Sequence, residues 1–108
     1  MQDYLIDSNV VINYVAEKSD SNVLTKLDVV FDKAFNYSVI TIMEVLGFND
    51  NIEVMSKFEE LFVGGNRLAM DDMIVSETIK IRKAVRIKLP DAIIAATAIV
   101  PQLGIINR

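Results

Sequence analysis

The chain has 108 residues, 52% of them apolar, and a net charge of −4, which is typical of a single domain with a buried core. It has no cysteine and no histidine, so disulfides, thiolate-bound zinc and imidazole catalysis are excluded. The longest apolar stretch, Ala92 to Val100, is well short of the roughly 18 residues of a membrane span, and the N-terminus lacks the features of a secretion signal. The composition predicts a cytoplasmic protein without a membrane partner, whose chemistry depends on carboxylates, hydroxyls and amines.

The first elements along the chain are predicted to be a buried strand and a helix. Tyr4 to Ile6 is short and apolar and has an acid on either side, as in a central strand covered on both faces. Asp7, Ser8 and Asn9 are all favourable N-cap residues. A helix is predicted after them because apolar residues recur at helical spacing, namely Val10, Val11, Tyr14 and Val15.

The hydrophobic period changes in the next part of the chain. After a polar break at 19–22, a second amphipathic helix is predicted over 24–34. Tyr37 to Ile40 reads as a strand, and a helix is predicted from Thr41 until Gly47 ends it. Thr41 and Glu44 have the spacing of a capping box, in which the glutamate binds the backbone of the cap residue.

A further helix over 54–62 is predicted to close in a turn at Gly64-Gly65-Asn66 before a short strand, Arg67 to Met70. Asp71 or Asp72 is then expected to cap a helix whose inward face is Ile74, Thr78, Ile81 and Val85. Pro90 opens the last helix, Ala92 to Val100, which is apolar all round and is predicted to be buried. The sequence Gly104 to Arg108 resembles the start of one more strand.

This alternation of strands and helices predicts a single α/β domain over residues 1–108 with a mostly parallel central sheet. In such sheets, ligands bind at the carboxyl ends of the strands. A candidate active site should therefore combine residues that directly follow strands.

Three acids meet this condition only in part when each is considered alone. Asp7 follows the first strand but could equally serve as an N-cap. Glu44 closely follows another strand and is expected to face the interior or a cleft, but it also completes the capping box. Asp91 lies in the first turn of the apolar helix, where the helix dipole favours an acid, but its neighbours on that helix offer no cation to pair with it.

Taken together, the three acids predict a divalent-metal site. Each lies near the start of a helix, and carboxylates that converge at one sheet edge would repel one another unless a cation lay between them. Mg²⁺ and Mn²⁺ prefer carboxylate oxygens, and such an ion activates water without any histidine. Asp7, Glu44 and Asp91 are therefore the predicted metal ligands of a hydrolase that cuts phosphodiester bonds.

A basic cluster precedes the last helix. Five of the eleven basic residues fall within nine positions: Lys80, Arg82, Lys83, Arg86 and Lys88. They could form one solvated helix face or hold a phosphate backbone. On the second interpretation, the expected substrate contacts are Asn9, Lys80, Lys83, Arg86 and Lys88.

Around these acids the sequence resembles the PIN-domain family, and in particular the VapC-type toxins of toxin–antitoxin pairs. The resemblance rests on Tyr4 to Ile12, Ser38 to Gly47 and Ile87 to Ala98, and the Leu-Pro-Asp-Ala motif that begins at Leu89 is its most specific part. It implies a three-layer α/β/α fold and an endoribonuclease dependent on Mg²⁺ or Mn²⁺. It also implies a homodimer and a cognate antitoxin as partners.

The resemblance further implies roles for individual residues. Asp7, Glu44 and Asp91 become the acidic site, Ser8 orients water, and Asn9 braces the loop. The family pattern continues past the last strand to a fourth acid, whereas this sequence ends at Arg108, with Asn107 at a position that is usually Thr or Ser. The expected domain is therefore cut short at its final strand and tail, and reduced activity is expected.

Other classes remain as alternatives. A haloacid-dehalogenase-like phosphatase needs a second aspartate where Asn9 stands, and a phosphoacceptor receiver needs an acid where Ile6 stands. A PIN-like module that binds RNA or an antitoxin without efficient cleavage is the stronger competitor.

Overall fold

The computed structural model describes residues 4–15, 28, 31, 35–101 and 104–106. Within these ranges, parallel strands form one sheet in the order β3-β2-β1-β4. The strands are β1 (Tyr4–Ile6), β2 (Asn36–Ser38), β3 (Asn66–Leu68) and β4 (Gly104–Ile106). The predicted α/β class with a parallel sheet is confirmed. The expected polar break at 19–22, most of the helix over 24–34, and residues 107–108 lie outside the described residues.

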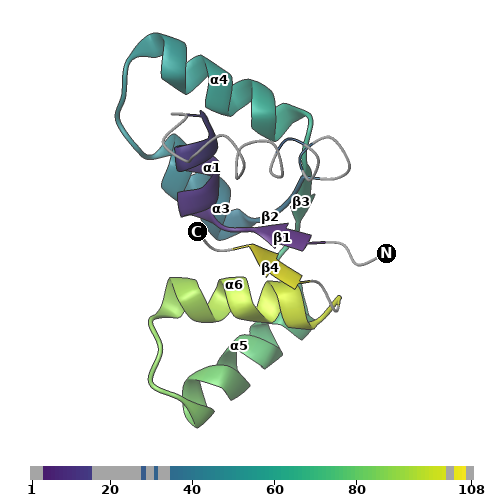
Figure 1. The fold of residues 1–108 in the computed structure, drawn as a ribbon. Helices are drawn as coiled ribbons and strands as arrows, with labels where there is room; N and C mark the ends of the chain where they lie inside the picture. Colours follow the sequence, from purple (N-terminus) through teal and green to yellow (C-terminus); the bar gives the residue numbers. More distant parts are fainter. Residues whose placement is uncertain (1–3, 16–27, 29–30, 32–34, 102–103, 107–108) are drawn as a thin grey trace.

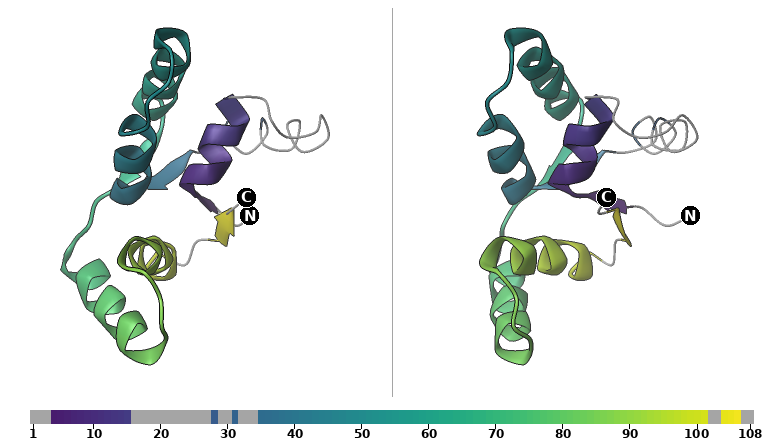
Figure 2. Two further views of the ribbon diagram at one scale, coloured as in Figure 1. Left: turned by 90° about the vertical axis from the view of Figure 1, so that its left-hand side faces the viewer. Right: turned by 60° about the vertical axis from the view of Figure 1, so that its left-hand side comes forward.

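Helices cover both faces of the sheet (Figures 1 and 2). On one face lie α1 (Ser8–Val15), α3 (Val39–Leu46) and α4 (Ile52–Val63), and on the other lie α5 (Asp72–Ala84) and α6 (Leu89–Ile99). Successive side chains of a strand point to opposite faces, so Ile6 packs beneath α1 while Leu5 packs against α6. These three layers are the predicted α/β/α arrangement. None of the helices in the described ranges is long and apolar enough to cross a membrane.

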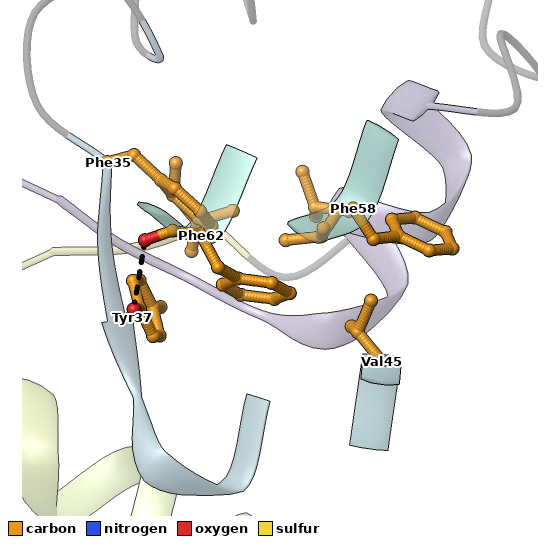
Figure 3. Close-up of a cluster of buried hydrophobic side chains, with 8 residues drawn as sticks. Phe35, Tyr37, Val45, Phe58 and Phe62 are labelled. Carbon is orange, nitrogen blue, oxygen red and sulfur yellow. Dashed lines mark hydrogen bonds between the residues drawn. The ribbon is translucent and has the colours of Figure 1, made fainter. Parts of the chain in front are cut away.

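The larger core lies between the sheet and the α1, α3 and α4 layer. Figure 3 shows its aromatic centre, where the Tyr37 hydroxyl donates to the Phe62 carbonyl at 3.2 Å. The ring of Phe35 lies 5.0 Å from that of Tyr37 and 5.5 Å from that of Phe62, centroid to centroid. Phe58 and Val45 complete this part of the cluster, and both are almost fully buried. Such packed rings fix the position of β2 relative to α4.

The start of α3 corrects the expected boundary. The strand β2 ends at Ser38, two residues earlier than predicted, and the Ser38 hydroxyl accepts hydrogen bonds from the amides of Ile40 and Thr41. Ser38 is thus the N-cap, and Thr41 lies inside the helix. The predicted capping box is therefore wrong, and Glu44 is not needed to cap this helix.

The last helix also differs from its expectation. It begins at Leu89, one residue before Pro90, which was predicted to open it. Proline fits the first turn of a helix without losing a hydrogen bond. It is buried along most of its length, but Leu89 is 47% exposed and Ile99 is 51% exposed. The prediction that this helix is completely buried is therefore wrong. Val85, expected to point inward from α5, ends that helix as its C-cap and is also exposed.

Thr41 gives a test of the core on the α3 side. Its hydroxyl is fully buried and has no hydrogen-bond partner in the part of the chain that the structure describes. An unpaired buried hydroxyl destabilises the folded state, so Thr41→Val is expected to raise the free energy of unfolding by about 1 kcal/mol. Thr97 is equally buried but donates to the Ile93 carbonyl at 2.6 Å, so Thr97→Val should give no such gain. Urea unfolding of both variants measures the difference, and a loss of stability in Thr41→Val would show that this hydroxyl is paired.

Candidate active site

The three candidate acids belong to elements that start from the carboxyl edge of the sheet. Asp7 directly follows β1, and because Leu5 is level with Asn36, Asp7 lies level with Ser38, where α3 begins. The helix α6 leads into β4, which is parallel to β1, so the first turn of α6, with Asp91, lies at the same edge. The topology therefore brings Asp7, Glu44 and Asp91 toward one region, as the sequence predicted.

Ser8 connects two of these acids. Its hydroxyl donates to Oε1 of Glu44 at 2.6 Å, across 36 residues of sequence. Its backbone amide donates to Oδ1 of Asp7 at 2.7 Å. The Asp7 carboxylate thus binds the first amide of α1, whereas a usual N-cap side chain binds the second or third. Glu44 therefore makes a tertiary contact with α1 instead of the capping contact expected within α3.

The Asp7 carboxyl is the electrostatic centre of the group. Burial raises its pKa from the ordinary value of 3.8, the hydrogen bond from the Ser8 amide opposes this rise, and the negative charges of Glu44 and Asp91 add to it. Glu44 and Asp91 therefore both lie within electrostatic range of Asp7. In the absence of a cation, ionised Asp7 is therefore disfavoured in the folded chain.

Two details of the site differ from the predicted arrangement. Glu44 was expected to face the interior or a cleft, and Asp91 was expected to be a buried charge in need of a partner. Both residues are exposed, and only Asp7 is half-buried. Neither carboxylate is paired with a Lys or Arg of the described residues, and their exposure to water makes this tolerable.

The donor set suits a hard divalent ion, although the side chains are not arranged around one. Among the described residues, no three acidic groups lie close enough together to hold a single ion. One oxygen of Glu44 accepts the Ser8 hydroxyl instead. Carboxylate oxygens are the preferred ligands of Mg²⁺ and Mn²⁺, and the repulsion felt by Asp7 is of the kind that a cation relieves. Rotation of the exposed Glu44 and Asp91 side chains is required for all three to bind one ion.

The other residues that were expected to contact the substrate lie in different parts of the structure. Asn9 is exposed in the first turn of α1, and within the described residues its side chain makes no hydrogen bond. Lys80 pairs with Glu77 on the surface of α5 at 3.5 Å, and Lys88 precedes α6 as its N-cap. Lys83 and Arg86 line a hollow between α5 and α6 together with Arg82. Arg82 was part of the basic cluster but not of the expected contact set, because spacing alone does not show where a loop turns.

Comparisons with known proteins find strong similarity in structure but little similarity in sequence. No protein-family model matches the chain, and no curated protein has a significantly similar sequence. The structure resembles a toxin–antitoxin complex from Klebsiella pneumoniae, with a TM-score of 0.77 and 25% identity over 97% of this chain and 85% of that one. VapBC2 from Rickettsia felis, bound to a DNA fragment from its promoter, also gives a TM-score of 0.77, at 16% identity over 96% and 85% of the two chains.

A third similar structure is FitAcB from Neisseria gonorrhoeae, with a TM-score of 0.73 and 24% identity over 97% of this chain and 86% of that one. These similarities extend over nearly the whole chain. They confirm the predicted fold, and they agree with the resemblance found in the sequence.

Proposed function

We propose that this chain, which has the fold of the VapC-type PIN-domain toxins, is a divalent-metal-dependent endoribonuclease of a toxin–antitoxin pair. The observation that carries the proposal is the convergence of Asp7, Glu44 and Asp91 at the carboxyl edge of the sheet, close enough that two of them raise the pKa of the third. No structural role requires three like charges at this position.

In this proposal Asp7, Glu44 and Asp91 hold Mg²⁺ or Mn²⁺. When bound, such an ion activates water toward a phosphodiester and neutralises the charge that develops on the phosphoryl group. Asp7 supplies the fixed ligand because it is half-buried and its Oδ1 is held by the Ser8 amide. Glu44 and Asp91 supply exposed, adjustable carboxylates.

Ser8 is assigned a positioning role at this site. Its hydroxyl donates to Glu44 at 2.6 Å, which orients that carboxylate toward the end of β1. A hydroxyl so placed can also accept a hydrogen bond from a water at the site, because donation leaves its lone pairs free. Ser8 therefore links the orientation of Glu44 to that of the attacking water.

The proposed partners follow from the similar structures. The similar structures include a toxin–antitoxin complex and VapBC2 bound to a DNA fragment from its promoter, which supports a protein antitoxin as the partner of this chain. We further propose RNA as the substrate and a homodimer as the active assembly. The acidic net charge argues against nonspecific coating of nucleic acid, so the substrate should be held locally, near the acids.

A cleavage assay with metal removal tests the proposal. An end-labelled, unstructured RNA should be cut in the presence of Mn²⁺ or Mg²⁺, should remain intact with excess EDTA, and should be cut again when metal is restored. Cleavage that persists in EDTA would contradict the metal assignment. RNA binding without cleavage under every metal condition would instead favour the alternative, a PIN-like module that holds RNA or an antitoxin without cutting.

A further inference from the structure

A basic hollow lies where α5 turns into α6. It has a volume of about 410 Å³ and is lined by Arg82, Lys83, Ala84, Val85, Arg86 and Ile87. The first two residues come from the last turn of α5, and Arg86 comes from the extended segment that follows the Val85 C-cap. The hollow therefore combines side chains from both sides of a helix end, which a solvated helix face would not do.

No acidic side chain of the described residues balances the charge of this hollow. Three of its six lining residues are cationic and none is acidic. Arg82, Lys83 and Arg86 form no ion pair within the described residues, whereas Lys80, one turn before Lys83, pairs with Glu77. Some of this charge interacts favourably with the C-terminal end of the α5 dipole, but Arg86 lies beyond the helix. Unpaired guanidinium groups around a concave surface suit an oxyanion, since their planar forks bind phosphate with two hydrogen bonds.

The hollow lies next to the proposed active site along the chain. Arg86 and Asp91 are five residues apart, so their Cα atoms cannot be more than about 18 Å apart. The intervening segment ends in the first turn of α6, whose N-cap, Lys88, makes no side-chain capping bond. Asp91 and the hollow are thus attached to opposite ends of one short segment, and one extended ligand can contact both.

We propose that this hollow binds a backbone phosphate of the RNA strand away from the bond that is cut. The identity of the ligand as RNA rests on the proposed function, whereas the affinity for phosphate rests on the hollow alone. Arg82 and Arg86 are the principal ligands and Lys83 adds charge. The contact gives no base specificity, because phosphates carry no sequence information. The contact fixes the register of the RNA in the site. Substrates too short to reach the hollow should be cleaved more slowly, because binding energy from a remote group assists the reaction at the bond that is cut.

The salt dependence of binding tests this assignment. The affinity of a labelled 12-nucleotide oligouridylate is measured by fluorescence anisotropy between 50 and 200 mM NaCl, in EDTA so that no cleavage occurs. For single strands, the slope of log affinity against log salt is negative, and each lost phosphate contact reduces its magnitude by about 0.7. Arg82→Gln with Arg86→Gln should therefore reduce the magnitude of the slope by about 1.4 and weaken binding roughly tenfold at 50 mM NaCl.

Lys57→Gln with Arg67→Gln is the matched control, because it removes two exposed charges from α4 and from the edge strand β3. It should leave the slope within about 0.3 of the wild-type value. In a second arm, inorganic phosphate is titrated into the isotopically labelled chain and the amide signals of residues 82–87 are followed by NMR. Shifts at these amides that disappear in the Arg82→Gln, Arg86→Gln variant are expected.

The proposal is overturned if the two double variants show the same slope, or if phosphate leaves the amides of 82–87 unshifted. A glutamate decapeptide that binds the hollow more tightly than the oligonucleotide would also overturn it, in favour of an acidic protein segment. These outcomes are independent of the nuclease assay. A chain that does not cut RNA but shows the change in slope keeps the phosphate site, and a chain that cuts RNA with an unchanged slope loses it.

Discussion

Asp7→Asn is expected to lower the rate of RNA cleavage at least about 100-fold while the chain remains folded. The amide has the same shape as the carboxylate and its oxygen can still accept the hydrogen bond from the Ser8 amide, which measures 2.7 Å in the wild type. What is lost is a negatively charged oxygen ligand at the only half-buried acid of the proposed site. The rate is measured with a labelled RNA at saturating Mn²⁺.

The same variant should be more stable than the wild type at neutral pH. Burial raises the pKa of Asp7 in the folded chain, and the charges of Glu44 and Asp91 raise it further. The folded state therefore binds the proton more tightly than the unfolded state, and stability falls as the pH rises from the unfolded value near 3.8 through the folded pKa. Asparagine has no such titration, so its advantage should be absent at low pH and complete at neutral pH.

Urea unfolding at several pH values, with and without Mn²⁺, separates these effects. Without metal the stability difference between Asp7→Asn and the wild type should grow with pH, and Mn²⁺ should stabilise only the wild type. Asp50→Asn is the matched control, because Asp50 also binds the amide of the next residue at 2.7 Å but is exposed, and its charge is not among those that raise the pKa of Asp7. Equal stabilisation of both variants by Mn²⁺ would remove Asp7 from the metal site.

Gly65→Ala is expected to destabilise the fold by about 3 kcal/mol. A Cβ atom at this position would lie 2.6 Å from Cδ2 of Phe35 and 2.8 Å from Cε1 of Tyr37. Both rings are buried and pack against each other and against Phe62, so neither can move aside without opening the core. The close approach of this backbone to two rings is what requires glycine here.

Gly64→Ala is the control for this prediction. The nearest heavy atom to a Cβ at Gly64 is 3.9 Å away, and the residue has helical dihedral angles as the C-cap of α4. Alanine should therefore be neutral there or should stabilise by about 0.5 kcal/mol. Thermal or urea unfolding measures both variants, and a loss of stability below 1 kcal/mol in Gly65→Ala would show that the aromatic cluster is loosely packed.

The sequence by itself determined the elements in which apolar residues recur at a regular spacing. Three features were predicted because each depends on neighbours within a few residues: the apolar run of β1, the amphipathic pattern of α4 and the position of Pro90 in the first turn of α6. The three acids could also be selected, because each is close to a strand end or a helix start. Their convergence on one sheet edge followed from the parallel topology, which alternating strands and helices already predicted.

Only the tertiary structure decided what depends on residues distant in sequence. The N-cap of α3 is Ser38 and not the predicted Thr41, because β2 ends earlier than propensity suggests. Glu44 therefore does not cap the helix, and it accepts a hydrogen bond from Ser8. Exposure of Glu44 and Asp91 depends on how α3 and α6 pack against the sheet, which composition does not encode. Composition also does not show that Lys80 pairs with Glu77 whereas other members of the basic cluster line the hollow. Local periodicity specifies elements, but contacts between elements are fixed by packing across the whole core, and the site consists of such contacts.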